Sequence, residues 1–484
     1  MAARVSVFNR IGPPHPGFNN VSFYGQDHWK KKSKVSLTYG VRWEVNPSPG
    51  MRRDQNAFAV NQVTDISEMK VAPHATPLWK TTYGNFAPRI GFAYQLSDDS
   101  GKELVLRGGV GLLYDTGQDR VGEVLTDSLP FLSGSSVFSS PFPGGLLRAN
   151  IPGDLPLSIF DPHLKLPYTF TWNLTMQRAL GSSQSISTSY VGSVGRRLLS
   201  TQTLFGRNPE FSFIRLTTNA GKSNYQSMQV QFDRRLDRRL WSLISYTWSK
   251  SLDNTSPDSA ANALLASTEL GNDWGPSDFD VRHTLTGALS YEIPVPTTTG
   301  VGNALFSNWT FDSIFNARSA RPLNVVYDFP TTFGFAYLRP NLVSGVPLYL
   351  LDSSAAGGRS INAAAFVVPL ELNQGDLGRN ALRGFPFYQI DIALRRKFNF
   401  SEFVSLQLQV DAYNVMNHPN FDDPSGIDLS LGTKFATSGP LHPNVTFGES
   451  ASLVGRSVLR GGGFGSFYGP GGARALRLSL KLVF

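Results

Sequence analysis

The chain has 484 residues, no cysteine and a formal net charge of +8. Hydrophobic residues make up 41% of the sequence and charged residues 17%, a balance typical of a folded protein. The absence of cysteine excludes a disulfide scaffold, a thiolate zinc site and a cysteine nucleophile.

Two kinds of hydrophobic segment are missing from the sequence. The apolar runs 110–114 and 263–266 end far short of the roughly 18 residues that a membrane-spanning helix needs. Residues 1–20 contain Arg4, Arg10 and three prolines, but no apolar core of a secretory signal. We therefore expect residues 1–20 to be an upstream loop or strand segment of a longer protein.

Alternation of apolar and polar residues is the main pattern along the chain. In 35–45 every odd position is apolar or aromatic, while the even positions hold Ser, Thr, Gly, Arg and Glu. Such a period of two predicts strands with one apolar and one polar face. Thirteen segments show it strictly or loosely: 21–30, 34–45, 83–97, 102–115, 167–180, 184–195, 224–236, 239–250, 281–293, 305–318, 386–398, 402–415 and 474–484.

The lengths of these segments and of their connections indicate the class of sheet. Many run to ten or more residues, as a tilted strand needs to cross a bilayer, whereas strands of soluble proteins average five or six. Short connections such as 98–101 and 399–401 alternate with long ones, namely 46–82, 116–166, 196–223, 251–280, 319–385 and 416–473. This pattern predicts an all-β, transmembrane antiparallel β-barrel with short periplasmic turns and long extracellular loops.

The number of strands constrains how such a barrel closes. Bacterial single-chain barrels have an even number of strands, so thirteen predicted strands indicate an incomplete barrel. Open strand edges in lipid would leave backbone groups without hydrogen bonds. The edge strands 21–30 and 474–484 must therefore pair with further strands or, in parallel, with each other.

Several segments, in order along the chain, carry a family resemblance. The hairpin Phe23–Lys30 (FYGQDHWK) and Leu37–Glu44 (LTYGVRWE) resembles one found in Oar-like TonB-dependent outer-membrane receptors. Further matching segments are Asn85–Tyr94, Leu106–Asp115, Tyr246–Asp253, Asp278–His283 and Asn414–Phe421.

The resemblance implies a function and a set of partners. A receptor of this family has a signal peptide, a plug and a barrel of about 22 strands. It takes up a scarce, bulky solute with energy that TonB delivers through the plug. We expect residues 21–484 to be the C-terminal part of the barrel, without plug, with outer-membrane lipid and the missing strands of the receptor as partners. TonB would act only through the absent plug.

Charged residues on the polar face of the predicted strands are the candidate site. Their expected role is mutual ion pairing and hydration, and the functional alternative is contact with a plug or a polar solute. These residues are Arg42, Glu44, Arg89, Arg107, Asp233, Asp391, Arg395, Asp411, Arg477 and Lys481.

The end of the chain carries a separate signal. Leu480, Leu482 and Phe484 lie on the apolar face of the last predicted strand. A terminal phenylalanine that completes such an alternation resembles the signal read by the barrel-assembly machinery. We therefore expect that machinery to be a partner.

Motifs of enzymes and of cofactor sites are absent from the sequence. It contains no Gly-x-Ser-x-Gly and no His-Glu-x-x-His, and its seven histidines are scattered. The basic cluster at 234–239 flanks a predicted periplasmic turn, where anionic lipid headgroups are the expected neighbours rather than nucleic acid. We expect no enzyme, no cofactor and no metal.

Three alternative functions stay open from the sequence. A passive outer-membrane pore or a surface adhesin would use the same wall and loops without energised transport. A soluble β-sandwich or propeller would bury the apolar faces, and an outer-membrane enzyme would need a catalytic pair that no spacing here nominates.

Overall fold

A computed structural model shows the fold of the chain. It describes residues 3–10, 14–31, 34–51, 57–126, 132–140, 156–237, 239–256, 273–294, 307–331, 334–369, 374–401, 403–424, 450, 453 and 471–484. Among these residues, no helix is both long and apolar enough to cross a membrane.

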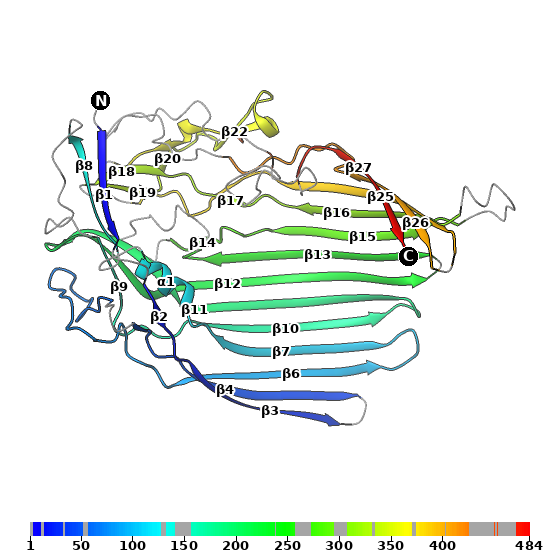
Figure 1. Cartoon of the computed structure of the whole chain (residues 1–484), viewed down its shortest axis with the longest axis horizontal. Coiled ribbons are helices and arrows are strands. Elements are labelled where there is room, and N and C mark those ends of the chain that lie inside the picture. Colours follow the sequence, from blue (N-terminus) through cyan, green and yellow to red (C-terminus); the bar gives the residue numbers. More distant parts are fainter. Residues whose placement is uncertain are drawn as a thin grey trace.

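One large antiparallel sheet dominates the structure (Figure 1). Its thirteen main strands follow one another in sequence order, each hydrogen-bonded to the next, and they confirm the thirteen predicted segments. They are β3 (Val21–Lys31), β4 (Val35–Val45), β6 (Asn85–Ser97), β7 (Leu104–Tyr114), β10 (Tyr168–Ala179), β11 (Gln184–Asn208), β12 (Phe211–Asp237), β13 (Leu240–Asp253), β15 (His283–Glu292), β16 (Trp309–Arg318), β25 (Phe387–Asn399), β26 (Ser405–Tyr413) and β27 (Ala475–Val483).

The two ends of the sheet differ. The short connections, such as those from β3 to β4 and from β25 to β26, lie at one end, and the long ones lie at the other (Figure 1). We call these the short-turn end and the long-loop end. In an outer-membrane barrel they face the periplasm and the exterior respectively.

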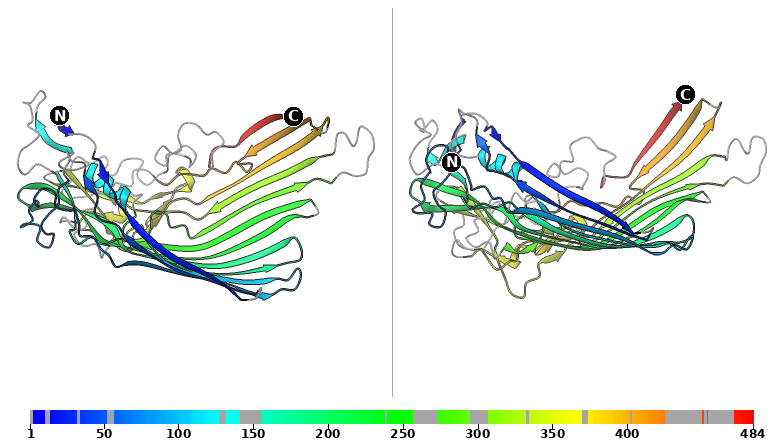
Figure 2. Two further views of the ribbon diagram at one scale, coloured as in Figure 1. Left: turned by 60° about the horizontal axis from the view of Figure 1, so that its bottom comes forward. Right: turned by 90° about the horizontal axis from the view of Figure 1, so that it is seen from below.

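The sheet is curved and open. Its edge strands β3 and β27 lie at opposite ends of the strand order, and Figure 2 shows the curvature from two sides. The parallel pairing of 21–30 with 474–484, one of the two expected closures, does not occur among the described strands. Pairing of these edges with further strands stays a prediction.

Exposure of the strand residues is the reverse of that in a soluble protein. Large apolar side chains in mid-strand are exposed, with Leu174 at 47%, Trp248 at 53% and Leu478 at 76%. Small polar residues of the opposite face are more covered, and Ser227 is only 3% exposed. The apolar faces are therefore not packed together in an interior, as a β-sandwich would require, and they suit contact with lipid.

One predicted loop is wrong. Residues 196–223 form the outer half of a long hairpin, because β11 and β12 continue past the expected strand ends. Strand β9 (Pro156–Phe160) pairs in parallel with β12 between Phe213 and Thr217. Apolar residues of this extension are buried against the loops, which explains why it folds without a regular alternation.

The remaining elements belong to the loops and the N-terminal segment. Strand β1 (Ala3–Arg10) pairs with β8 (Leu132–Ser140), and β2 (Pro16–Gly17) pairs with β5 (Gly50–Met51). The expected boundary at residue 20 stays a prediction. The other elements are α1 (Gln118–Thr126), β14 (Gly275–Pro276), β17 (Pro322–Leu323), β18 (Tyr327–Thr331), β19 (Gly334–Leu338), β20 (Asn341–Leu342), β21 (Tyr349–Leu351), η2 (Ala356–Gly358), β22 (Arg359–Ile361), η3 (Ala363–Ala365), β23 (Phe366–Val367) and β24 (Leu382–Arg383).

Candidate functional site: the polar face and two loop lobes

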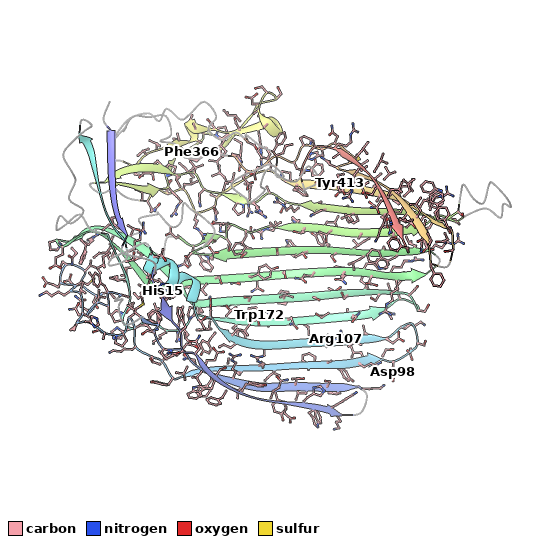
Figure 3. The ribbon with its side chains drawn as sticks, in the orientation of Figure 1. His15, Asp98, Arg107, Trp172, Phe366 and Tyr413 are labelled. Atoms are coloured by element: carbon pink, nitrogen blue, oxygen red, sulfur yellow. The ribbon has the colours of Figure 1, made fainter. Side chains whose placement is uncertain are left out.

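The strand register places the candidate charged residues relative to one another. Residues directly opposite in neighbouring strands share a face, and Arg107 lies opposite Thr175, which in turn lies opposite Ser189. Followed across the sheet, this register puts all ten candidates on one face, which we call the polar face. Figure 3 labels Arg107 on this sheet.

Five of the ten candidates form ion pairs on the polar face. Arg42 Nε lies 2.8 Å from Glu44 Oε1, and Arg477 Nη2 lies 2.8 Å from Asp411 Oδ2. Arg395 donates to both carboxylate oxygens of Asp312, with 2.8 Å from Nη2 to Oδ1. Asp312 was not among the sequence candidates, although its polar position in 305–318 was readable from the alternation.

The polar face also carries an amide and carboxylate network. Gln389 Nε2 donates to Asp391 at 2.8 Å, and the Asn414 backbone N–H donates to the same carboxylate at 2.7 Å. Gln409 Nε2 donates to Asp411 at 2.6 Å. The glutamines and Asn414 were also missed, because single amides in a polar stripe give no distinctive signal.

The other four candidates are not brought together. Arg89, Arg107 and Lys481 are exposed, Asp233 is half-buried, and none forms an ion pair within the described part of the chain. Two arginines of the β6 and β7 strands therefore offer guanidinium groups to whatever occupies the polar side. Their functional role stays a prediction.

The first loop lobe lies at the long-loop end and consists of residues 57–80, 115–126, 156–166 and 196–223. Leu157 and Ile159 of β9 are completely buried in it, and the rings of Trp79 and Phe160 meet edge-on with centroids 5.3 Å apart. These loops therefore have an apolar core of their own.

Asparagine side chains tie this lobe to the hairpin of β11 and β12. Asn208 Nδ2 donates to the carbonyl oxygens of Ile66 at 2.8 Å and Met69 at 3.2 Å. Asn219 Oδ1 accepts from the Lys165 backbone N–H at 2.6 Å, and its Nδ2 donates back to the Lys165 carbonyl. Buried amides with full sets of partners fix loop positions specifically.

The second loop lobe consists of the described residues of 319–386. Its core is apolar and buried: Leu323, Val325, Tyr327, Leu338, Ile361, Ala365, Phe366, Leu377 and Leu382. Figure 3 labels Phe366 in this lobe, near the edge of the sheet. Burial raises the pKa of Tyr327 to about 12, so its phenol is neutral at physiological pH.

Buried charges hold the second lobe to the connection between β13 and β15. Arg379 donates to Asp253, to Ser256 Oγ at 2.8 Å and to Asp278, and its side chain is only 1% exposed. Arg383 Nη2 lies 2.7 Å from Asp280 Oδ2. Sequence reasoning missed this cluster, because its members come from segments that carry no periodic pattern.

The lipid-facing side shows a recurring pair of aromatic residue and glycine. Phe92, Trp172 and Phe315 lie directly opposite Gly108, Gly192 and Gly287 in the neighbouring strand. A Cβ atom on each of these glycines would overlap the facing ring. Each ring therefore covers the neighbouring backbone, a contact that pins strand register.

The last strand is exposed on its apolar face. Leu480 is 69% exposed, Leu482 55% and Phe484 92%. Strand β27 forms a backbone ladder with β26, with Leu480 opposite Leu408. Within the described residues, no three His, Asp or Glu side chains gather as a metal site would require.

The fold and the inverted exposure define the wall of a membrane β-barrel. A family model described as "Outer membrane beta barrel domain" matches residues 2–449. The chain belongs to this family, and it is a protein of the bacterial outer membrane. A search of curated proteins found no match.

Several solved structures are similar in arrangement. The outer membrane transporter YddB from Escherichia coli shares 11% identity at a TM-score of 0.45, over 96% of this chain and 54% of that one. The copper transporter OprC gives 11% and 0.43, over 96% and 47%. BauA, the ferric preacinetobactin receptor of Acinetobacter baumannii, gives 12% and 0.42, over 83% and 39%. The chain thus spans about half the length of the first two structures or less.

Proposed function

We propose that the chain forms the wall and outer loops of a TonB-dependent receptor that takes up a scarce, bulky solute. The inverted exposure of the strands carries the proposal, because it leaves an apolar face for lipid and a charged face for an aqueous interior. The segments that resemble Oar-like receptors, among them Phe23–Lys30, support it.

The two loop lobes give the proposal its recognition surface. Both lie at the end that faces the exterior and have their own buried cores, so they can present a fixed surface to a solute. The exposed Arg89 and Arg107 would then face the plug or the solute inside the wall. The chain would act by binding and passage rather than by catalysis.

Partners follow from the same proposal. The edges of β3 and β27 would pair with the remaining strands of the receptor, and TonB would act through a plug of the same receptor. Leu480, Leu482 and Phe484 would be read by the barrel-assembly machinery. These statements rest on the family resemblance together with the open edges of the sheet.

Single cysteines test the membrane arrangement, since the native chain has none. Leu351 in the second lobe is 94% exposed, and Asp99 lies in the short turn between β6 and β7. In intact cells, an impermeant maleimide should label Leu351→Cys but should label Asp99→Cys only after the outer membrane is permeabilised. The opposite pattern would refute the orientation.

Transport is tested with labelled ferric citrate and a labelled peptide as probes in cells that contain the complete receptor. Energised uptake predicts accumulation that stops when a protonophore collapses the inner-membrane gradient. Entry of either probe that ignores the protonophore would support the passive pore instead. Surface binding without accumulation would support the adhesin.

A further inference from the structure

An arginine interrupts the apolar face of β25. Arg396 stands on the same face as Ile390, Ile392, Leu394 and Phe398, because these positions are separated by even steps along the strand. It lies three residues before the strand ends at Asn399, which puts it about 10 Å from the short-turn end.

The guanidinium group of Arg396 lies over two aromatic rings. Its Cζ is 4.2 Å from the ring centroid of Phe398 and 5.4 Å from that of Trp309. Phe398 is the next residue on this face toward the short turn, so the side chain bends from the apolar row toward the membrane surface. Cation–π contact places the group but leaves its N–H donors free for other partners.

Arg396 lacks an acidic partner on its own face. The residue is only 6% exposed, and its Nε is buried with no hydrogen-bond acceptor among the described atoms. Directly opposite it stand Trp309 on β16 and Leu408 on β26. The nearby carboxylates, Asp312 and Asp411, lie on the polar face and pair with other arginines.

A covered charge of this kind calls for an anion from outside the chain. Leaving a buried guanidinium without acceptors costs free energy, and its planar donors match the oxygens of a phosphate. At the short-turn rim the surrounding phase supplies such phosphates as phospholipid headgroups. Phe400 and Phe403 in the adjoining turn, 67% and 80% exposed, suit the membrane interface.

We propose that Arg396, Trp309 and Phe398 form a site for the phosphate of one phospholipid on the lipid-facing wall at the periplasmic rim. The guanidinium donates to the phosphate oxygens, while the rings hold it in place. The exposed Leu480, which lies opposite Leu408, borders the path of the acyl chains. This proposal needs the outer-membrane placement only and is independent of any transported solute.

Native mass spectrometry of the full chain, extracted in mild detergent and supplied with phosphatidylglycerol or phosphatidylethanolamine, tests the site. The wild type should retain one lipid more than Arg396→Gln. Arg178→Gln is the matched control, because Arg178 is exposed on the apolar side of β10, near the same end, and has no aromatic contact in the described structure. It should retain lipid as the wild type does.

Two further measurements separate a built phosphate site from a loss of charge, a loss of fold or a site for free phosphate. Arg396→Lys keeps the charge but loses the planar fork, so it should retain at least severalfold less lipid, while heat-modifiable migration in gels shows that it is folded. Inorganic phosphate in large excess should not displace the lipid. Equal lipid retention in wild type and both Arg396 variants, or displacement by free phosphate, would overturn the proposal.

Discussion

Arg379 and Asp253 form a buried ion pair across 126 residues of sequence. Their side chains are 1% and 4% exposed, and the same guanidinium also bonds Ser256 and Asp278. The pair joins the second loop lobe to the end of β13. The shape of the external surface therefore depends on one arginine that no local sequence pattern marks.

Removal of Arg379 should detach this lobe. Arg379→Ala leaves Asp253 buried without its partner, a change that costs about 3–5 kcal/mol. We expect faster hydrogen exchange and protease cleavage in 319–386, with the strands unchanged. Lys34→Ala is the control, since the Lys34–Asp98 pair is 49% and 59% exposed and such pairs contribute about 0–1 kcal/mol. Equal protection in both variants would contradict this role.

Most of the sheet was predictable from the sequence, and the lobes were not. Strands such as β4 and β27 alternate because one face meets lipid and the other meets water, so their environment is written in period two. Helix α1 and the extension of β11 and β12 fold through contacts between distant loops. No local pattern encodes such contacts.

The candidate site shows the same division. Alternation alone found Arg395 and Asp411, and it could have found Asp312, which occupies a polar position of its strand. Which charges pair depends on register between strands, and the sequence does not give register. Arg396 was passed over as well, because a single arginine in an apolar row has meaning only once its neighbours are known.

The two faces of β10 should respond differently to charge. Leu174 is 47% exposed on the apolar face, and Asn173 beside it lies on the polar face. Leu174→Arg should lower stability in lipid vesicles by about 2–4 kcal/mol, the cost of arginine near the bilayer midplane. Asn173→Arg should change it far less. Urea titration of vesicle-inserted protein measures both, and similar losses would argue against lipid on the Leu174 side.

The pair of Trp172 and Gly192 should limit substitution on the neighbouring strand. A Cβ at Gly192 would overlap the Trp172 ring, so Gly192→Ala must displace it, at a cost of about 1–3 kcal/mol. Gly91→Ala is the control, because its Cβ would lie 3.7 Å from the Gly108 carbonyl oxygen. Tryptophan emission and the unfolding midpoint should shift in the first variant alone. An unshifted midpoint in Gly192→Ala would show that the ring moves freely.

High pH should loosen the second lobe through Tyr327. Burial raises the pKa of this phenol from 10.0 to about 12, so the folded lobe keeps it neutral while an unfolded lobe would ionise it. The stabilisation is complete below pH 10 and is lost as the pH rises from there toward 12. Tyr327→Phe removes the ionisable group and should keep the lobe protected over this range. Hydrogen exchange corrected for its intrinsic pH dependence compares the two, and parallel loss of protection would assign the alkaline opening to other groups.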